Sequence, residues 1–563
     1  MTRHFRHAAV SLLFAAACGG RGELELSPFP DQGASGAGAV TAHAGATGVG
    51  KGGSSSRGGA PGSASGGSFG SGATFGTGGS FGTAGTFAVA GTFSSAGSLP
   101  VGGTFGTAGT FAIAGTSGMA GSENGQAGEP GVAGAGSAAP VAEQDVAQLA
   151  TGLFHVCALG VLGDVKCWGA GDHGALGYGS TAALGDNEAP RSLPAVEVAD
   201  DASEHVAQIV AGGYHTCVLF TSGTVKCWGE NSDGQLGYGD VLQTRGSSIV
   251  PASFGTVEVS ASATVTALSL CAGEKHTCAL LSDGSVKCWG SNARGQLGYG
   301  NAARVGAKLA PADVAPVSLS NQLKATQLAC GANHTCAVLS DGTVQCWGEN
   351  ADGQLGLGNV AIIGDDEKPD SVGSISLGLA SGVMVKQIVA GHSHTCILTS
   401  DQTVRCWGVS TALGIGTTAN VGDTEPPSSV SAVRLVGANE TARPVRLSAG
   451  SFHTCALFDS GTTKCWGRSD FGELGQGDLL PVGIDNDPAD VPMIPINTAL
   501  DSGASAIFAG NFLSCLLLPG LHPLDHTSLY CWGWNEYGQL GHGDTVTIGD
   551  DEQPGSGGPV QAF

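Results

Sequence analysis

Apolar and polar positions between His276 and Gly300 follow a pattern that the rest of the chain repeats. The first six residues, HTCALL, alternate as a short strand does, SDG is typical of a turn, and SVKCWG alternates again. A turn centred on Asp283 pairs Cys278 with Cys288 on one face of an antiparallel hairpin. The pattern therefore predicts a hairpin followed by glycine-rich turns, and one such hairpin is too small to bury its own faces.

Seven copies of this hairpin follow one another along the chain. The other six begin at His155, His215, His334, His394, His453 and Leu513. The last copy is degenerate, because Leu513 replaces the histidine and its hairpin loop is longer. The tryptophans that end the hairpins fall 58 to 66 residues apart and are Trp168, Trp228, Trp289, Trp347, Trp407, Trp466 and Trp532. A period near 60 with only short strands is typical of a propeller blade.

A further strand precedes each hairpin, as Pro194–Val198 does in the second repeat. The first hairpin has no equally clear strand before it, whereas the chain ends in a segment of that form, Gly558–Phe563. We therefore expect residues 558–563 to complete the first blade and so to close the ring, which removes open sheet edges.

Composition divides the chain into three parts. Residues 1–17 have the basic start, the short apolar run and the small residues of an export signal. Residues 18–140 are mostly Gly, Ala, Ser and Thr, and residues 141–563 hold the repeats. Within the second part phenylalanines keep a six-residue register from Phe69 to Phe111. We expect a disordered, flexible spacer there, with a left-handed β-helix as the alternative.

The apolar run ends in AAAC at Cys18, which resembles the lipobox of bacterial lipoproteins. That resemblance implies cleavage before Cys18 and lipidation of its new N-terminus. We expect an exported chain held by this lipid at the outer membrane or cell surface, with ordinary cleavage and secretion as the alternative. The formal net charge of −24 excludes nucleic acid as a partner, because few cations are present to neutralise phosphates.

Fourteen of the 17 cysteines form seven local pairs. We expect them to be disulfides of an exported protein and not zinc ligands, since each pair lies across one hairpin. The pairs are Cys157 with Cys167, Cys217 with Cys227, Cys278 with Cys288, Cys336 with Cys346, Cys396 with Cys406, Cys455 with Cys465, and Cys515 with Cys531. Cys271 and Cys330 are left over, and the sequence allows either buried thiols or an extra bridge.

The motifs GEKHTCAL, DGSVKCWG and NARGQLGYG between Gly273 and Gly300 resemble the regulator of chromosome condensation (RCC1) repeat. Secreted bacterial relatives in that family include a beta-lactamase inhibitor protein. The resemblance covers about three-quarters of the chain and implies an all-β fold, a seven-bladed β-propeller of four-stranded blades around a central channel. It leaves the function open, because the fold hosts exchange factors, enzyme inhibitors and structural adaptors.

Two repeated features raise the question of metal binding. The histidines at the hairpin starts recur in nearly every repeat, so we expect each ring to bond backbone groups beside its own hairpin. The tryptophans are expected to pack between blades. Acidic loops recur too, and their carboxylates are candidate calcium ligands. These candidates are Asp186, Glu188, Asp365, Asp366, Asp423, Asp550 and Asp551. Turn chemistry is the simpler interpretation of these loops.

No catalytic motif of a hydrolase, metalloprotease or nucleotide-binding enzyme is present in the sequence, and no cofactor is expected. We expect a non-enzymatic lipoprotein with a monomeric propeller that binds another protein or a cell-surface polymer. Two alternatives stay open. One is an inhibitor of a secreted enzyme, and the other is a polysaccharide-active lyase or hydrolase with convergent carboxylates at the channel mouth.

Overall fold

The computed structural model describes residues 144–201, 203–240, 244–496, 503–520 and 526–563, and two short strands, β1 (Gly79–Ser80) and β2 (Thr86–Phe87). β1 and β2 pair antiparallel with each other. The expected export signal, Cys18 and the remainder of the spacer lie outside the described residues.

All the other described strands belong to seven antiparallel sheets, here numbered as blades 1 to 7 in chain order. The inner strands are β3 (Val146–Thr151), β6 (Val206–Ala211), β10 (Ala267–Ala272), β13 (Ala325–Cys330), β16 (Val385–Ala390), β19 (Pro444–Ala449) and β22 (Ala506–Ala509). The middle strands are β4 (His155–Gly160), β7 (His215–Phe220), β11 (His276–Leu281), β14 (His334–Leu339), β17 (His394–Thr399), β20 (His453–Phe458) and β23 (Leu513–Leu518). The third strands are β5 (Val165–Gly169), β8 (Val225–Glu230), β12 (Val286–Gly290), β15 (Val344–Gly348), β18 (Val404–Gly408), β21 (Thr463–Gly467) and β24 (Ser528–Gly533).

The hairpin register agrees with the prediction from the alternation. Cys278 pairs with Cys288, and Leu280 pairs with Val286, between β11 and β12. The inner strand directly before each hairpin was not predicted from the sequence. All six residues of β11 are buried, because the blade packs on both faces against its neighbours. In blade 2 a short strand, β9 (Thr244–Arg245), also pairs with β8.

A fourth extended segment lies beside the third strand of every blade. In blade 1 the N–H of Val196 donates to the oxygen of Val165 at 2.7 Å, and in blade 7 that of Val560 donates to Leu529 at 2.6 Å. The expectation that residues 558–563 complete the first blade is therefore wrong. The segment returns to the hairpin that precedes it in the chain, so each blade is one contiguous stretch.

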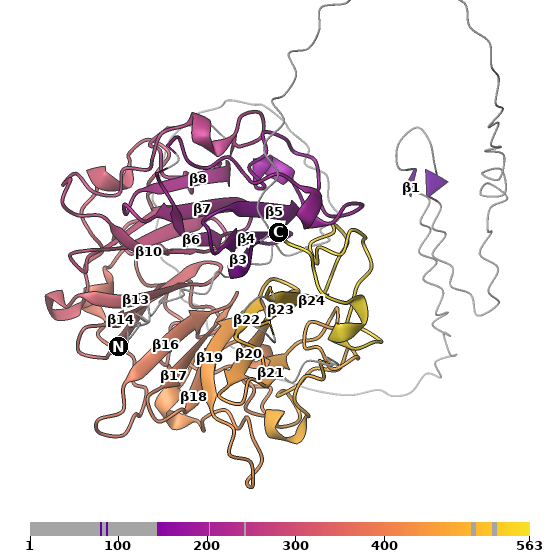
Figure 1. The fold of residues 1–563 in the computed structure, drawn as a ribbon. Coiled ribbons are helices and arrows are strands. Elements are labelled where there is room, and N and C mark those ends of the chain that lie inside the picture. Colours follow the sequence, from indigo (N-terminus) through magenta and orange to yellow (C-terminus); the bar gives the residue numbers. More distant parts are fainter. Residues whose placement is uncertain are drawn as a thin grey trace, which may run out of the picture. The chain divides into compact units, whose positions relative to one another are not determined.

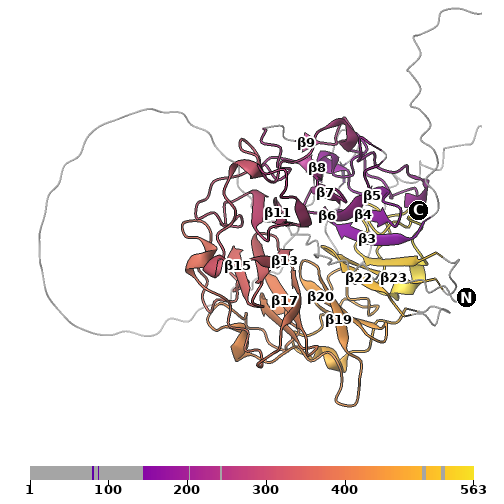
Figure 2. The same cartoon turned by 60° about the vertical axis from the view of Figure 1, so that its left-hand side comes forward.

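The blades follow one another around a common axis, and blade 7 lies beside blade 1 (Figures 1 and 2). At this last junction Oγ1 of Thr151 donates to the oxygen of Ala509 at 3.4 Å. The C-terminal segment also reaches blade 1, because the N–H of Arg191 donates to the oxygen of Gln561 at 2.7 Å. The ring is thus closed by contacts between complete blades and not by a shared strand.

Short 3-10 helices connect the strands, and most of them begin at a proline, whose fixed φ suits the first helical position. They are η2 (Asp172–Gly174), η3 (Pro190–Ser192), η4 (Pro251–Ser253), η5 (Pro311–Asp313), η6 (Ser320–Gln322), η7 (Pro369–Ser371), η8 (Ser410–Ala412), η9 (Pro427–Ser429), η10 (Pro488–Asp490) and η11 (Pro554–Gly557). In the described part of the chain, no helix has the length and apolar character that crossing a membrane requires.

Candidate functional site

Junctions between neighbouring blades carry a chain of hydrogen bonds that begins at a repeated histidine. Between blades 3 and 4, Nε2 of His276 lies 3.0 Å from Oγ1 of Thr335, and this hydroxyl donates to the oxygen of Gln296 at 3.0 Å. Nε1 of Trp347 donates to the same oxygen at 3.0 Å. Because the hydroxyl proton is used on the carbonyl, the histidine is the donor and carries its proton on Nε2.

The histidine–hydroxyl contact recurs at five further junctions with distances of 2.9 to 3.0 Å. The pairs are His155 with Thr216, His215 with Thr277, His334 with Thr395, His394 with Thr454, and His453 with Ser514. We expected backbone partners within the same hairpin, and the Nε2 partner is instead a hydroxyl of the next blade. The histidines are therefore joints between blades.

Burial also keeps these imidazoles neutral. It lowers the pKa of His155 to about 4 and that of each of the other five to about 3. Each ring fits closely against a glycine, since a Cβ on Gly273 would lie 2.2 Å from Cε1 of His276. Within the described residues, the groups of side chains close enough to hold a metal contain no histidine.

The junction between blades 7 and 1 uses other residues at both positions. Leu513 stands at the histidine position and Val156 at the threonine position, and both are buried in one apolar cluster. The tryptophan contact is kept, since Nε1 of Trp168 donates to the oxygen of Gln539 at 3.0 Å. Because both polar groups are replaced together, neither position is left with a buried polar atom that has lost its partner.

A set of buried lysines in the third strands was missed by the sequence analysis. Lys166, Lys226, Lys287 and Lys464 are each at most 5% exposed. Nζ of Lys464 donates to the oxygens of Leu435 at 3.0 Å and of Pro488 at 2.8 Å. Burial lowers the pKa of this lysine. Each such ammonium holds the connecting segment against its blade, so the lysines are structural.

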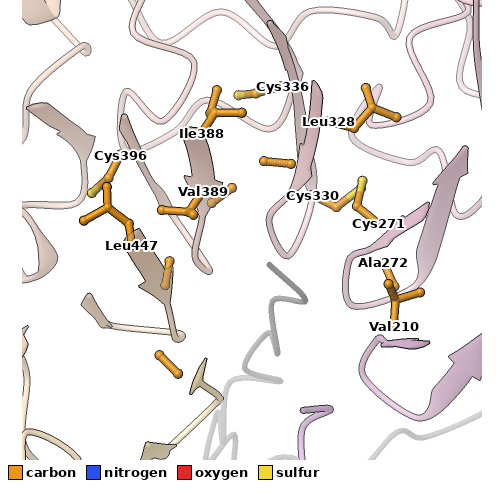
Figure 3. Close-up of a cluster of buried hydrophobic side chains, with 14 of the residues drawn as sticks. Val210, Cys271, Ala272, Leu328, Cys330, Cys336, Ile388, Val389, Cys396 and Leu447 are labelled. Carbon is orange, nitrogen blue, oxygen red and sulfur yellow. A yellow bond between two sulfur atoms is a disulfide. The ribbon is translucent and has the colours of Figure 1, made fainter. Parts of the chain in front are cut away.

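Eight disulfides stabilise the described residues. Seven join the cysteine pairs named above, one within each hairpin. The eighth joins Cys271 of β10 to Cys330 of β13 and so links blades 3 and 4 (Figure 3). The sulfur of Cys278 lies within 4.8 Å of both. Because Cys278 is itself bridged to Cys288, this sulfur cluster is two neighbouring disulfides and not a zinc site.

The structure brings some of the calcium candidates together and leaves others apart. Asp365 and Asp366 converge with Glu367, and Asp550 and Asp551 converge with Glu552, with ligand atoms within 4.8 Å. Asp186, Glu188 and Asp423 belong to no such group within the described residues.

Hydrogen bonds of the kind found in turns occur in these acidic loops. The N–H of Gly185 donates to Oε1 of Glu188 at 3.3 Å, and that of Thr424 donates to Oδ1 of Asp423 at 2.8 Å. Burial, together with the nearby Asp366, raises the pKa of Glu367 to about 7.

The loops that join inner to middle strands form a ring at one end of the axis. The N–H of Leu153 donates to the oxygen of Gly213 at 3.0 Å, and the N–H of Gly213 donates to the backbone oxygen of Glu274 at 2.9 Å. The N–H of Ser451 donates to Gly510 at 3.2 Å in the same way. We call these the mouth loops, which are residues 152–154, 212–214, 273–275, 331–333, 391–393, 450–452 and 510–512.

One side of this mouth is aromatic. We call the following set the aromatic arc: His173, Tyr214, Phe154, Tyr537, Trp534, Phe471 and Phe512. Neighbouring rings in it have centroids 5.1 to 6.0 Å apart, and most pack edge to face. The arc draws on blades 6, 7, 1 and 2. Phe154 and Trp534, at its centre, are partly exposed. Such a contiguous set of rings, of which all but the buried Phe512 are at least partly exposed, is typical of a binding surface.

The other side of the mouth is polar and charged. Lys275, Asn333 and Ser393 stand in blades 3 to 5 where blades 1 and 2 have Phe154 and Tyr214. Nζ of Lys275 lies 3.4 Å from Oε1 of Glu230, the last residue of β8.

A carboxyl group on the same charged side, that of Glu274, has a perturbed pKa. Burial raises it to about 7, with Lys275 opposing the shift and Glu230 and Glu349 adding to it. Sequence reasoning missed this division of the mouth, although its signal was available. The residue before each repeated histidine varies within an otherwise constant motif.

Comparisons with known proteins agree with this architecture. A family model described as the RCC1-like domain matches residues 252–561. The chain belongs to the RCC1-like family. Models of the regulator of chromosome condensation (RCC1) repeat also match residues 163–219 and 206–235 of this RCC1-like chain. The predicted seven-bladed propeller fold is thereby confirmed.

Relatives of the RCC1-like chain come from several kinds of protein. It is 30% identical to the ultraviolet-B receptor UVR8 of Arabidopsis thaliana, over 60% of this chain and 67% of that protein. It is 28% identical to the human E3 ubiquitin-protein ligase HERC2, over 57% of this chain and only 6% of HERC2.

Solved structures show the same fold at lower sequence identity. Human WBSCR16 superimposes with a TM-score of 0.53 and 21% identity, covering 66% of this chain and 85% of that one. Yeast RCC1 (Prp20), solved bound to Kap60, has a TM-score of 0.52 and 19% identity, with 78% and 91% covered.

Proposed function

We propose that this chain is a non-enzymatic binding scaffold whose propeller mouth holds another protein. The aromatic arc carries the proposal. Tyr, Trp and Phe are enriched at the centres of protein interfaces, where large rings bury much area for little entropy. In the arc, Phe154 contacts Tyr214, Trp534 and Tyr537, so the rings are held in place before any partner arrives.

Geometry favours a protein partner over a cell-surface polymer. A sugar ring stacks on an aromatic face that is open, whereas Phe471, Phe512 and Trp534 pack closely against one another. The charged side of the mouth adds groups that suit a protein surface, such as Lys275 and Glu230. Fixed charges around an aromatic centre select partners by complementarity.

Relatives with this fold bind proteins as well. Yeast RCC1 (Prp20) is solved bound to Kap60, and another structure of Prp20p is described with its binding to Gsp1p and histones. These partners belong to those proteins, and the low identity transfers only the fold. They support protein binding as a use of the fold.

The scaffold acts, in this proposal, at the cell envelope, held by a lipid on Cys18 at the outer membrane or cell surface. The lipobox-like AAAC and the eight disulfides, which suit an oxidising compartment, support this location. Replacing the cysteine, Cys18→Ala, is expected to move the protein from the membrane fraction to the soluble fraction. Labelled palmitate incorporated into the wild type and absent from the variant is the direct measurement. Unchanged membrane association would contradict the anchor.

Protein binding at the mouth is tested with the full chain in a pull-down of envelope proteins. Trp534→Ser introduces the residue that blade 3 has at the same place, Ser291. The matched control is Leu268→Ser, which removes an exposed apolar side chain at the far end of β10 from its mouth loop. A specific partner is captured by wild type and by the control and lost with Trp534→Ser at unchanged melting temperature. Equal capture by all three contradicts the proposal, and an enzyme that loses activity when captured identifies an inhibitor.

A polysaccharide hydrolase is the second candidate function, and Glu274 is the observation that favours it. A carboxyl whose pKa is about 7 carries a proton near neutral pH and is able to act as a general acid. Glu230 lies on the same side of the mouth and is paired with Lys275. Release of reducing ends from envelope polysaccharides by wild type, and its loss in Glu274→Gln, would establish this function. No release would exclude it for the polymers assayed.

A further inference from the structure

Two cavities occupy the same place in two different blades, beside the loop that follows the third strand. One lies in blade 3 and has a volume of about 330 Å³. The other lies in blade 7 and has a volume of about 390 Å³. Their walls come from equivalent positions of the repeat, so the scaffold is shared and only the side chains differ.

The blade 3 cavity has apolar walls. Val305, Leu309, Val314 and Pro316 line it, and Leu309 is 50% exposed. Tyr299 lines it too, with its hydroxyl already used on the backbone oxygen of Cys288 at 2.9 Å. A ligand in this cavity would therefore meet mainly aliphatic carbon.

Two cations stand among these apolar walls. Arg304 bonds Asp233 through Nε at 3.0 Å and the oxygen of Ser232 through Nη1 at 3.3 Å, which leaves Nη2. Lys368 comes from the loop of the next blade and is exposed. Its Nζ makes no hydrogen bond or ion pair with any described residue. An ammonium without a partner beside apolar carbon suits a ligand that is an anion at one end only.

The blade 7 cavity has the opposite character at the same positions. Glu552 stands where blade 3 has Leu309, His542 replaces Tyr299, and Asp544 replaces Asn301. The position of Lys368 is taken by Ala189. The difference follows from the loop sequences, because blade 3 has Gly306-Ala-Lys308 where blade 7 has an acidic Gly-Asp-Asp-Glu.

We propose that the blade 3 cavity binds an aliphatic carboxylate, with the chain against Leu309 and Val314 and the carboxylate at Lys368. A volume of about 330 Å³ lies within the range of small-molecule sites. Phosphate or another compact polar anion would leave the apolar walls wet. A carboxylate on an alkyl chain satisfies both the walls and the ammonium, through apolar burial and a charge-assisted hydrogen bond. This inference is independent of partner binding at the mouth.

Calorimetric titration of the full chain with sodium decanoate tests the site, with decylammonium chloride as the probe of opposite charge. Lys368→Ala is expected to weaken decanoate binding about tenfold or more, and Leu309→Glu, which copies blade 7, is expected to abolish it. The matched control is Lys308→Ala, which removes a cation that directly precedes Leu309 in the chain but does not line the cavity. It is expected to bind like wild type. Melting temperatures of the three variants close to that of wild type establish that they are folded.

Three results would overturn the proposal. The first is the absence of decanoate binding to wild type. The second is equal binding of decylammonium, which would show that the cations of the cavity do not select the charge of the ligand. The third is an equal loss in Lys368→Ala and Lys308→Ala, which would reduce the effect to general surface charge.

Discussion

Leu513 and Val156 occupy, where blade 7 meets blade 1, the two positions that hold a hydrogen-bonded histidine and threonine or serine at the other junctions. This junction therefore differs from the other six at both positions of the polar pair. One junction has exchanged both members of the polar pair for apolar residues, and the ring still closes around it.

The same exchange is expected to be tolerated elsewhere only when both residues change. Thr335→Val leaves the buried Nε2–H of His276 without its acceptor, which costs about 1–3 kcal/mol of unfolding free energy. The double variant with His276→Leu is expected to lose less than the sum of the two single variants. A double-mutant cycle by urea unfolding measures this coupling. Strict additivity would show that the pair does not act as a unit.

Acid is expected to destabilise the fold through the junction histidines. In the folded chain their pKa is about 3 to 4, below the ordinary 6.5, so the unfolded chain binds more protons as the pH falls. Their contribution is present above pH 6.5 and is lost progressively below it, by roughly 2 kcal/mol per histidine at pH 5.

Several carboxyl groups act in the opposite direction over the same range. Burial raises the pKa of Glu274, Glu367 and Glu473 to about 7 and also raises that of Glu552, so the folded chain binds protons on them first and is stabilised below pH 7. The six histidines outweigh these carboxyls, and we expect the melting temperature to fall from pH 7 to pH 5. The double variant His276→Leu with Thr335→Val should show a shallower fall. An unchanged slope would contradict the assignment to the junctions.

The bridge between blades 3 and 4 is expected to add stability without deciding the fold. Changing Cys271→Val and Cys330→Ala installs residues that blades 2 and 5 have at these positions. Closing a loop of 59 residues is worth about 4 kcal/mol in the chain-entropy model, so the melting temperature should fall. Non-reducing peptide mapping should still recover all seven hairpin pairs. Scrambled pairs would show that this bridge guides the others.

Deleting residues 558–563 is expected to damage blade 7 first. The deletion removes the hydrogen bond from Val560 to Leu529 and the buried side chains of Val560 and Phe563. Each fully buried large apolar side chain is worth about 1.5–3 kcal/mol. Hydrogen exchange should therefore rise in β24 before it rises in β3. Exchange that rises first in β3 would restore the idea that this segment belongs to blade 1.

Local alternation was enough to predict the hairpins, because Cys278 and Cys288 face each other within one short stretch of chain. The alternating pattern did not predict the burial of Lys287, because its position in the pattern and its charge indicate an exposed face. Its burial follows from packing between blades and from the carbonyl of Pro311, which accepts a hydrogen bond from Nζ at 2.9 Å. Neither is visible in the order of residues along one hairpin.

The aromatic arc could not be predicted from the sequence either, because it depends on the closure of the ring. Phe154 and Trp534 lie 380 residues apart in sequence, and only the closure of blade 7 on blade 1 places their centroids at 5.2 Å. The prediction that residues 558–563 belong to blade 1 was wrong for a related reason. Its sequence resembles every other fourth strand, and resemblance alone does not say which of two neighbouring hairpins it pairs with.

Because each blade is complete within its own stretch of chain, the protein can be assembled in the order in which it is made. A blade that has just been synthesised already contains all four of its extended segments and both cysteines of its hairpin. No edge has to wait for a strand from the far end of the polypeptide, and the two cysteines of each hairpin become available together. Contact between blade 7 and blade 1 is then the last step of assembly, and it creates the middle of the aromatic arc, so this surface is complete only after all seven blades have formed.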